Sequence, residues 1–311
     1  MHNFQVLTKP KFGLRIKYLR PMTAIRVQNL KKYFGKTKAV NGVSFEVNEG
    51  EILGFLGPNG AGKTTTIRCM MDFIRPTEGK IEILGRDAQK DSAELKTDIG
   101  YLSSETDLYK SWTGAEHINF MERLRGISSF DEELEKELKF DRRKRAGVLS
   151  TGNRQKLGII LALMHQPKLL ILDEPTVGLD PLLQNYIYEI LRAEAAKGNT
   201  IFMSSHNLAE VEKICDRVVI LKDGKIVAVE SINDIKRKRI YTIYAYFEGD
   251  VPKKDLVTNG IGLVEEFSDG LVLNVKGDIK PLLTKLSGFK NLKDLEITHA
   301  SLEEVFMEFY K

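Results

Sequence analysis

The sequence contains little cysteine and no apolar run of membrane-spanning length. Cys69 and Cys215 are the only cysteines among 311 residues, and both fall within apolar, helix-like runs. Two buried thiols in a reducing compartment are therefore expected, and disulfides do not hold the fold together. No window approaches the roughly eighteen apolar residues of a membrane-spanning helix, so any membrane role requires a partner. We expect a cytoplasmic protein.

Acidic residues are absent from residues 1–21, which carry five basic ones. The formal net charge of +4 comes from this segment, and the rest of the chain is close to neutral. This distribution argues against nucleic acid as a partner. The segment lacks the apolar stretch and the cleavage site of a secretory signal. One hypothesis is that translation starts at Met22, which would make residues 1–21 a basic extension that is not native; intact mass would test it.

One glycine-rich stretch organises the rest of the chain. It lies between an apolar run at 52–56 and a helix-like run that begins at Thr64. Its spacing, Gly-x-x-x-x-Gly-Lys-Thr, lets backbone N–H groups surround phosphate oxygens at a helix start. Lys63 is expected to reach the β- and γ-phosphates, and Thr64 to bind Mg²⁺. An ordinary glycine-rich turn is the alternative. The predicted phosphate-binding residues are Gly57, Pro58, Asn59, Gly60, Ala61, Gly62, Lys63, Thr64 and Thr65.

Two adjacent carboxylates, Asp173 and Glu174, follow the apolar run 169–172. This continuous run is typical of a central parallel strand covered on both faces. Carboxylates there need a partner, and nucleotide-bound Mg²⁺ is the natural one. Because neighbouring side chains point to opposite sides, one carboxylate can hold the metal while the other addresses an attacking water. His206 follows the strand-like run 200–203, at another strand end where doubly wound sheets bind ligands, although a structural histidine is the alternative.

Two weaker signals flank these motifs. Phe34 lies in an aromatic and basic turn over 31–36 and could stack on an adenine ring, although most such aromatics serve packing. Ser150 can cap a long apolar helix, whose free N–H groups could also bind an anion. Taken alone, this second segment is simply a capped helix.

Together, residues from about 24 to 230 resemble the ATP-binding subunit of an ABC transporter, because six short motifs occur in that family's order. These are Phe34 (or, less favoured, Tyr33) as the adenine-stacking aromatic, 57–65 as the Walker A loop, 149–155 as the LSGGQ-like element, 169–174 as Walker B, 178–180 as the D-loop, and His206 as the switch histidine. The resemblance implies an α/β P-loop NTPase fold, with a helical subdomain in the ABC ATPase domain.

The resemblance also implies a mechanism in which two ATPase subunits pair head to tail around two ATP molecules, as a homodimer or heterodimer. In it, Asp173 holds Mg²⁺ with Thr64, Glu174 polarises the attacking water, and His206 contacts the γ-phosphate.

Further nucleotide contacts follow from the same resemblance. Ser150 and Gly152 would touch the γ-phosphate of the opposite subunit's ATP. Nucleotide-binding positions are also implied at Val40, Asn153 and Asp180.

Two positions depart from the family's pattern. Ser104 stands where the family usually has a glutamine that senses Mg²⁺, so either water or Glu105 would take its place. Thr151 and Asn153 replace a glycine and a glutamine. If the backbone at 151 required a positive φ, threonine would resist it. We therefore expect a working but slower composite site.

The chain is expected to contain an ABC ATPase domain at 22–232, with the helical subdomain at about 103–150, and a small α+β domain at 233–311. Residues 297–306 resemble the C-terminus of ABC ATPases that serve separately encoded export permeases. For the small domain, a regulatory or dimer-stabilising role and a solubilising role both remain open.

The resemblance thus implies an ATP-hydrolysing subunit that powers transport, with export favoured, through a membrane permease on the inner face of the cell membrane, using ATP and Mg²⁺. One alternative is a soluble ABC ATPase acting on nucleic acid or ribosomes, but that class usually carries tandem halves or a long coiled coil. Another is an ATP-binding module without turnover, against which Glu174 argues.

Overall fold

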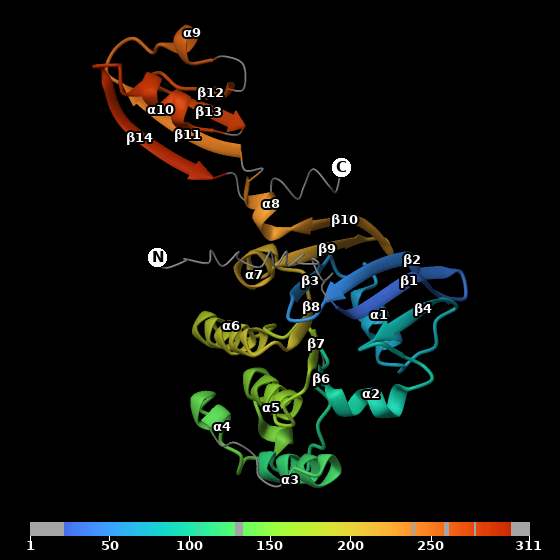
Figure 1. The fold of residues 1–311 in the computed structure, drawn as a ribbon. Coiled ribbons are helices and arrows are strands. Elements are labelled where there is room, and N and C mark those ends of the chain that lie inside the picture. Colours follow the sequence, from blue (N-terminus) through green and yellow to red (C-terminus); the bar gives the residue numbers. More distant parts are fainter. Residues whose placement is uncertain are drawn as a thin grey trace, which may run out of the picture.

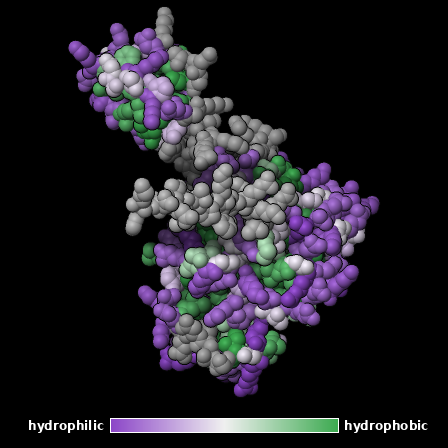
Figure 2. All heavy atoms as spheres, in the orientation of Figure 1, coloured by the Kyte–Doolittle hydropathy of each residue, from purple (hydrophilic) through white to green (hydrophobic). Residues whose placement is uncertain are grey.

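The computed structural model describes residues 22–104, 106–127, 133–237, 240–257, 261–276 and 278–299. Three expectations fall outside these residues: the basic extension 1–21, the alternative role of Glu105, and the part of the small domain beyond residue 299. None of the helices in the described part has the length and apolar character that crossing a membrane requires. Figure 2 shows a largely hydrophilic surface on the face toward the viewer, with apolar atoms in small separate groups.

A six-stranded sheet forms the centre of the larger part of the molecule. Its order is β10 (Lys225–Ser231), β9 (Arg217–Lys222), β3 (Ile52–Leu56), β8 (Thr200–Ser205), β7 (Leu169–Asp173) and β6 (Ile99–Leu102). Neighbours from β9 to β6 are parallel, and only β10 runs antiparallel to its neighbour. The segments that follow β3, β7 and β8 therefore leave the sheet at the same edge.

A second, antiparallel sheet packs beside the first. It contains β2 (Thr37–Asn48), β1 (Thr23–Phe34), β4 (Glu78–Ile83) and β5 (Arg86–Asp87), in that order. The core between the sheets includes Phe45, Phe55 and Phe202, whose ring centroids lie 5.2 to 5.7 Å apart. Burial of each such ring stabilises the fold by about 1.5–3 kcal/mol. The predicted turn over 31–36 is shorter than expected, because β1 continues to Phe34.

Helices cover the sheets; those before β6 contribute to the core between the sheets, and those after β6 form a second core with the other face of the six-stranded sheet (Figure 1). They are α1 (Lys63–Met70), α2 (Ser92–Asp98), α3 (Gly114–Arg125), α4 (Glu133–Glu137), the 3-10 turn η1 (Ala146–Val148), α5 (Thr151–Leu163), α6 (Pro181–Ala196) and α7 (Leu208–Ile214). The described residues between 103 and 150 are thus helical or irregular. Both cysteines are buried, as predicted.

The C-terminal part has its own sheet and core. After α8 (Ile232–Arg237) come β11 (Ile240–Phe247), α9 (Lys253–Leu256), β12 (Ile261–Glu266), β13 (Gly270–Lys276), α10 (Lys280–Leu286) and β14 (Leu292–His299). The strands lie in the order β12-β13-β11-β14, and all neighbours are antiparallel. This β-α-β-β-α-β succession is the ferredoxin-like arrangement. Figure 1 shows this sheet set apart from the other two, beyond α8.

Candidate active site

The loop between β3 and α1 has two positions where a side chain larger than hydrogen would meet a backbone carbonyl oxygen. Gly62 has φ 105°, and a Cβ atom there would lie 2.4 Å from the carbonyl oxygen of Ala39. Gly57 is equally restricted, since its Cβ would lie 2.5 Å from the carbonyl oxygen of Leu221. The loop then enters α1 at Lys63. The positive end of a helix is therefore placed beside a loop whose backbone can turn its N–H groups toward an anion.

Lys63 is almost fully buried, and its ammonium group is held by the loop itself. Its Nζ donates to the carbonyl oxygens of Gly57 at 2.7 Å and Pro58 at 3.3 Å. It also forms an ion pair with Glu174, with Nζ 3.2 Å from Oε1. The ammonium group thus stands between the phosphate loop and the end of β7.

Asp173 is fully buried, and two hydroxyl groups hold its carboxylate. The Thr64 hydroxyl donates to Oδ2 at 2.8 Å, and the Ser204 hydroxyl donates to Oδ1 at 2.5 Å. Burial, together with the charge of Asp173, raises the pKa of the nearby Tyr101 to about 12. The two residues that the sequence suggests as Mg²⁺ ligands, Thr64 and Asp173, are therefore already in contact.

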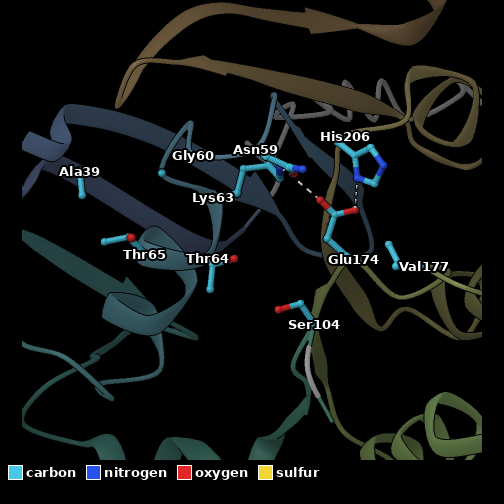
Figure 3. A pocket seen from close by; sticks show the side chains of 11 residues that line it. Ala39, Asn59, Gly60, Lys63, Thr64, Thr65, Ser104, Glu174, Val177 and His206 are labelled. Carbon is cyan, nitrogen blue, oxygen red and sulfur yellow. Dashed lines mark hydrogen bonds and ion pairs between the residues drawn. The ribbon is translucent and has the colours of Figure 1, made fainter. Parts of the chain in front are cut away.

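Glu174 lies at the centre of the site and has an unusual backbone. Its φ is 54°, in the left-handed region that residues other than glycine seldom adopt. One carboxylate oxygen faces Lys63, and the other lies 2.8 Å from Nδ1 of His206. Figure 3 shows the side chains of Lys63 and His206 meeting this carboxylate from two sides. The three groups form a continuous polar chain across the site.

These side chains line a cleft with a volume of about 460 Å³ (Figure 3). Its walls come from the phosphate loop, α1, the segments after β6, β7 and β8, and one residue of β2. The lining residues are Ala39, Asn59, Gly60, Gly62, Lys63, Thr64, Thr65, Ser104, Glu174, Val177 and His206. Motifs that lie more than a hundred residues apart in the sequence therefore meet at one place, as expected for strand ends at one edge.

Some residues suggested by the sequence lie elsewhere. Val40 is fully buried in the core, and its neighbour Ala39 lines the cleft instead. Phe34 is half exposed at the end of β1, where the ammonium group of Lys32 lies 5.0 Å from its ring centroid. Among the described residues that line the cleft, Phe34 does not occur.

The start of α5 and the start of α6 lie outside the cleft lining. The Ser150 hydroxyl accepts hydrogen bonds from the backbone and side-chain nitrogens of Asn153, which confirms that Ser150 caps α5. Gly152 lies in the first turn of the same helix. Asp180 caps α6, and its carboxylate accepts from the backbone N–H groups of Leu182 and Leu183.

The concern about threonine at position 151 does not apply. Thr151 begins α5 and is not among the residues with positive φ. A glycine backbone is required instead at Gly178, where φ is 74° and an added Cβ would lie 3.2 Å from the Thr151 methyl group. Threonine at 151 is therefore compatible with the helix and packs close to the segment after β7.

Two buried polar residues beside the site have no individual role predicted from the sequence, although one of them, Gln155, ends the LSGGQ-like element 149–155. The Gln155 side chain donates to the carbonyl oxygen of Pro175 at 2.8 Å. Glu210, on α7, accepts hydrogen bonds from Thr176 and Ser205. Burial raises the pKa of Glu210, although these hydrogen bonds oppose the shift. No local pattern in the sequence indicates these contacts, because they depend on how α5 and α7 pack against the sheet.

Comparison with known proteins identifies the family. The family profile described as ABC transporter matches residues 40–177. The bacitracin transport ATP-binding protein BcrA of Bacillus licheniformis is 35% identical over 92% of this chain and 97% of its own length. The Nod factor export ATP-binding protein I of a Rhizobium species is 34% identical over 91% and 96%. A solved ATP-binding subunit of an ABC transporter is 32% identical, with a TM-score of 0.63, over 69% of this chain and 92% of that one.

The chain therefore belongs to the ATP-binding proteins of the ABC transporter family. It is an ABC-type ATPase, and the predicted P-loop NTPase fold with a small α+β C-terminal part is confirmed. The two relatives align with almost the whole chain, so their similarity extends into the ferredoxin-like part.

Proposed function

We propose that the chain powers export through a separate membrane permease and that the cleft around Lys63, Glu174 and His206 is its ATP-hydrolysing site. The observation that carries the site assignment is the convergence of these three side chains on one cleft beside the phosphate loop. In this assignment the β- and γ-phosphates occupy the loop 57–65. The Lys63 ammonium then leaves its loop carbonyls and Glu174 to bind phosphate oxygens.

The residues at the base of the cleft fit a hard cation such as Mg²⁺. Asp173 offers carboxylate oxygens and Thr64 a hydroxyl, and oxygen ligands are the kind that Mg²⁺ prefers. In the described residues no group of three or more His, Cys, Asp or Glu could hold a metal by itself. We therefore propose that Thr64 and Asp173 hold Mg²⁺ together with phosphate oxygens. When bound, the cation neutralises charge that develops on the phosphates.

Glu174 is the proposed residue that polarises the attacking water. It is the carboxylate that faces the cleft, whereas Asp173 is fully buried behind it. His206 orients the Glu174 carboxylate through the 2.8 Å contact and is close enough to the cleft to contact the γ-phosphate. Phosphoryl transfer needs mainly such positioning and charge stabilisation.

We further propose that a second ATPase subunit completes the site. Four residues at the starts of α5 and α6 lie outside the cleft of their own subunit, as residues that serve the opposite subunit's ATP must: Ser150, Gly152, Asn153 and Asp180.

We assign the adenine to Phe34, whose ring is half exposed and available for stacking.

The partner of the dimer is proposed to be a membrane permease that holds the chain at the inner face of the cell membrane. Export is supported by the name of the Nod factor relative and by the resemblance of residues 297–306 to ATPases of export systems. Alkaline carbonate should release the chain from native membranes, because it removes peripheral proteins and leaves spanning ones.

The proposed units of the chain are the ATPase domain 22–232, with its helical subdomain at about 103–150, and the domain 233–311.

Steady-state ATPase activity of the purified chain tests the site. Glu174→Gln should abolish turnover and should form a dimer in Mg²⁺-free ATP that sizing detects. Glu189→Gln, which neutralises an exposed carboxylate on α6, serves as the matched control and should hydrolyse ATP like the wild type. If Glu174→Gln hydrolyses ATP as fast as the wild type, the role given to Glu174 is wrong.

A further inference from the structure

Glu210 is a buried carboxylate directly behind the catalytic segments. It lies on α7 and is 4% exposed. One carboxylate oxygen accepts a hydrogen bond from the Thr176 hydroxyl at 2.5 Å, and the other accepts from the Ser205 hydroxyl at 2.5 Å. Both oxygens are therefore used, and they are used by two different segments of the chain.

The two short hydrogen bonds reach the segments that carry the site. Thr176 comes two residues after Glu174, and Ser205 comes immediately before His206. On the cleft side, Glu174 and His206 contact each other at 2.8 Å. On the opposite side, Glu210 joins the same two segments through hydroxyl groups. The segments after β7 and β8 are thus connected twice, once by side chains in the site and once by Glu210.

Other hydrogen bonds make each of these segments locally well defined. The Ser205 hydroxyl accepts from the backbone N–H of Asn207 at 2.9 Å, and the Asn207 side chain in turn caps α7. On the other segment, the Thr176 carbonyl accepts from the Leu179 N–H at 3.2 Å. Each segment is therefore held by local hydrogen bonds of its own, and Glu210 adds the connection between the two.

We propose that Glu210 is a positioning residue that fixes the segment carrying Glu174 relative to the segment carrying His206. The proposal rests on the catalytic roles proposed above for those two residues. A carboxylate suits this task because it accepts two hydrogen bonds at once in a fixed geometry. Burial of a carboxylate costs stability, and a contact that served packing alone would be made at lower cost by an apolar side chain.

Three substitutions of Glu210 separate the effect of side-chain length from the effect of the negative charge. Glu210→Ala removes both hydrogen bonds, Glu210→Asp is one methylene too short to keep both, and Glu210→Gln keeps the length with one acceptor oxygen. We expect Glu210→Ala to lower kcat by about tenfold to a hundredfold, since a displacement of about 1 Å at a site can cost that much. The KM for ATP should stay within about threefold, because the phosphate loop is untouched. Glu210→Gln should retain more activity than Glu210→Asp.

The Thr176 hydroxyl provides a matched pair. Thr176→Ser keeps the hydrogen bond and should retain kcat, whereas Thr176→Val keeps the shape, loses the bond and should lower kcat. Since Thr176→Val and Glu210→Ala both remove the contact between Thr176 and Glu210, their effects should be less than additive. Glu189→Gln again controls for the loss of a charge at an exposed site. Thermal unfolding of every variant identifies any loss of kcat that comes from unfolded protein.

Hydrogen exchange without nucleotide gives a readout that does not depend on catalysis. In Glu210→Ala, amides in 176–179 and 207–210 should lose protection together, while those of α1 keep it. Unchanged protection and unchanged kcat in folded Glu210→Ala would overturn the proposal, as would a loss seen only in KM. If Glu174→Gln retains full turnover, the proposed function fails instead, and the exchange result still reports whether Glu210 joins the two segments.

Discussion

Glu174→Gln should tighten the binding of ADP to the isolated subunit. Without nucleotide, Lys63 is engaged by Glu174, and phosphate must compete for the same ammonium group. At 3.2 Å and an effective dielectric constant of about 20, two unit charges attract each other by about 5 kcal/mol. This is an upper limit, because desolvation opposes the attraction and Lys63 keeps two carbonyl contacts.

A net gain of about 1–2 kcal/mol, or about 5- to 30-fold in Kd, is therefore expected. Loss of the negative charge beside the phosphates acts in the same direction. ADP is the suitable ligand because it lacks the γ-phosphate on which the proposed composite dimer depends. Isothermal titration calorimetry on dilute protein without Mg²⁺ measures the change.

His206→Ala is the matched control for this experiment. It removes the other partner of the Glu174 carboxylate but leaves the ion pair with Lys63 in place. It should therefore not tighten ADP binding. An unchanged or weaker affinity in Glu174→Gln, or an equal gain in His206→Ala, would refute the competition for Lys63.

Three further predictions concern single positions. Gly62→Ala should abolish ADP binding in calorimetry and lower the thermal unfolding temperature, because φ is 105° and the added methyl group meets a carbonyl oxygen. Gly60→Ala shares the backbone strain, with φ 81°, but meets no atom within 4 Å, so it should lower that temperature less. Thr64→Ala should raise the Mg²⁺ concentration required for half-maximal ATPase activity while leaving Mg²⁺-free ADP binding nearly unchanged; an unaltered Mg²⁺ dependence would remove Thr64 from the metal site. Burial lowers the pKa of the His165 imidazole below its usual 6.5. The contribution of the neutral ring to the free energy of unfolding is therefore present above pH 6.5 and is lost as the pH falls through the folded-state pKa. His165→Gln should flatten the acid side of a plot of unfolding free energy against pH, and an identical plot would show that His165 does not contribute.

The parts of the site that motifs encode could be predicted from the sequence. The spacing of the glycine-rich loop predicts Lys63, whereas Asp173, Glu174 and His206 are predicted because each follows an apolar run, and parallel strands bring such ends to one edge. The structure places Lys63, Glu174 and His206 in one cleft, with Asp173 buried directly behind it.

Other parts depend on packing that local patterns do not specify. In β2, successive side chains alternate between the two faces, so a shift of one residue separates Ala39, in the cleft, from Val40, in the core. Glu210 could not be found because an acidic residue on a short helix is ordinarily solvated, and only the packing of α7 buries it. The strand order of the C-terminal sheet is likewise set by long-range pairing, as between β11 and β14.

The left-handed backbone of Glu174 lowers stability at a position whose side chain is required for the proposed activity. A non-glycine residue in this conformation costs about 1–3 kcal/mol, and the proline that follows restricts it further. Glycine would relieve that strain but would remove the carboxylate that faces Lys63 and His206. Selection for thermostability alone should therefore favour glycine at 174 and yield a more stable protein without turnover, so screens for robust variants of this ATPase need an activity criterion from the start.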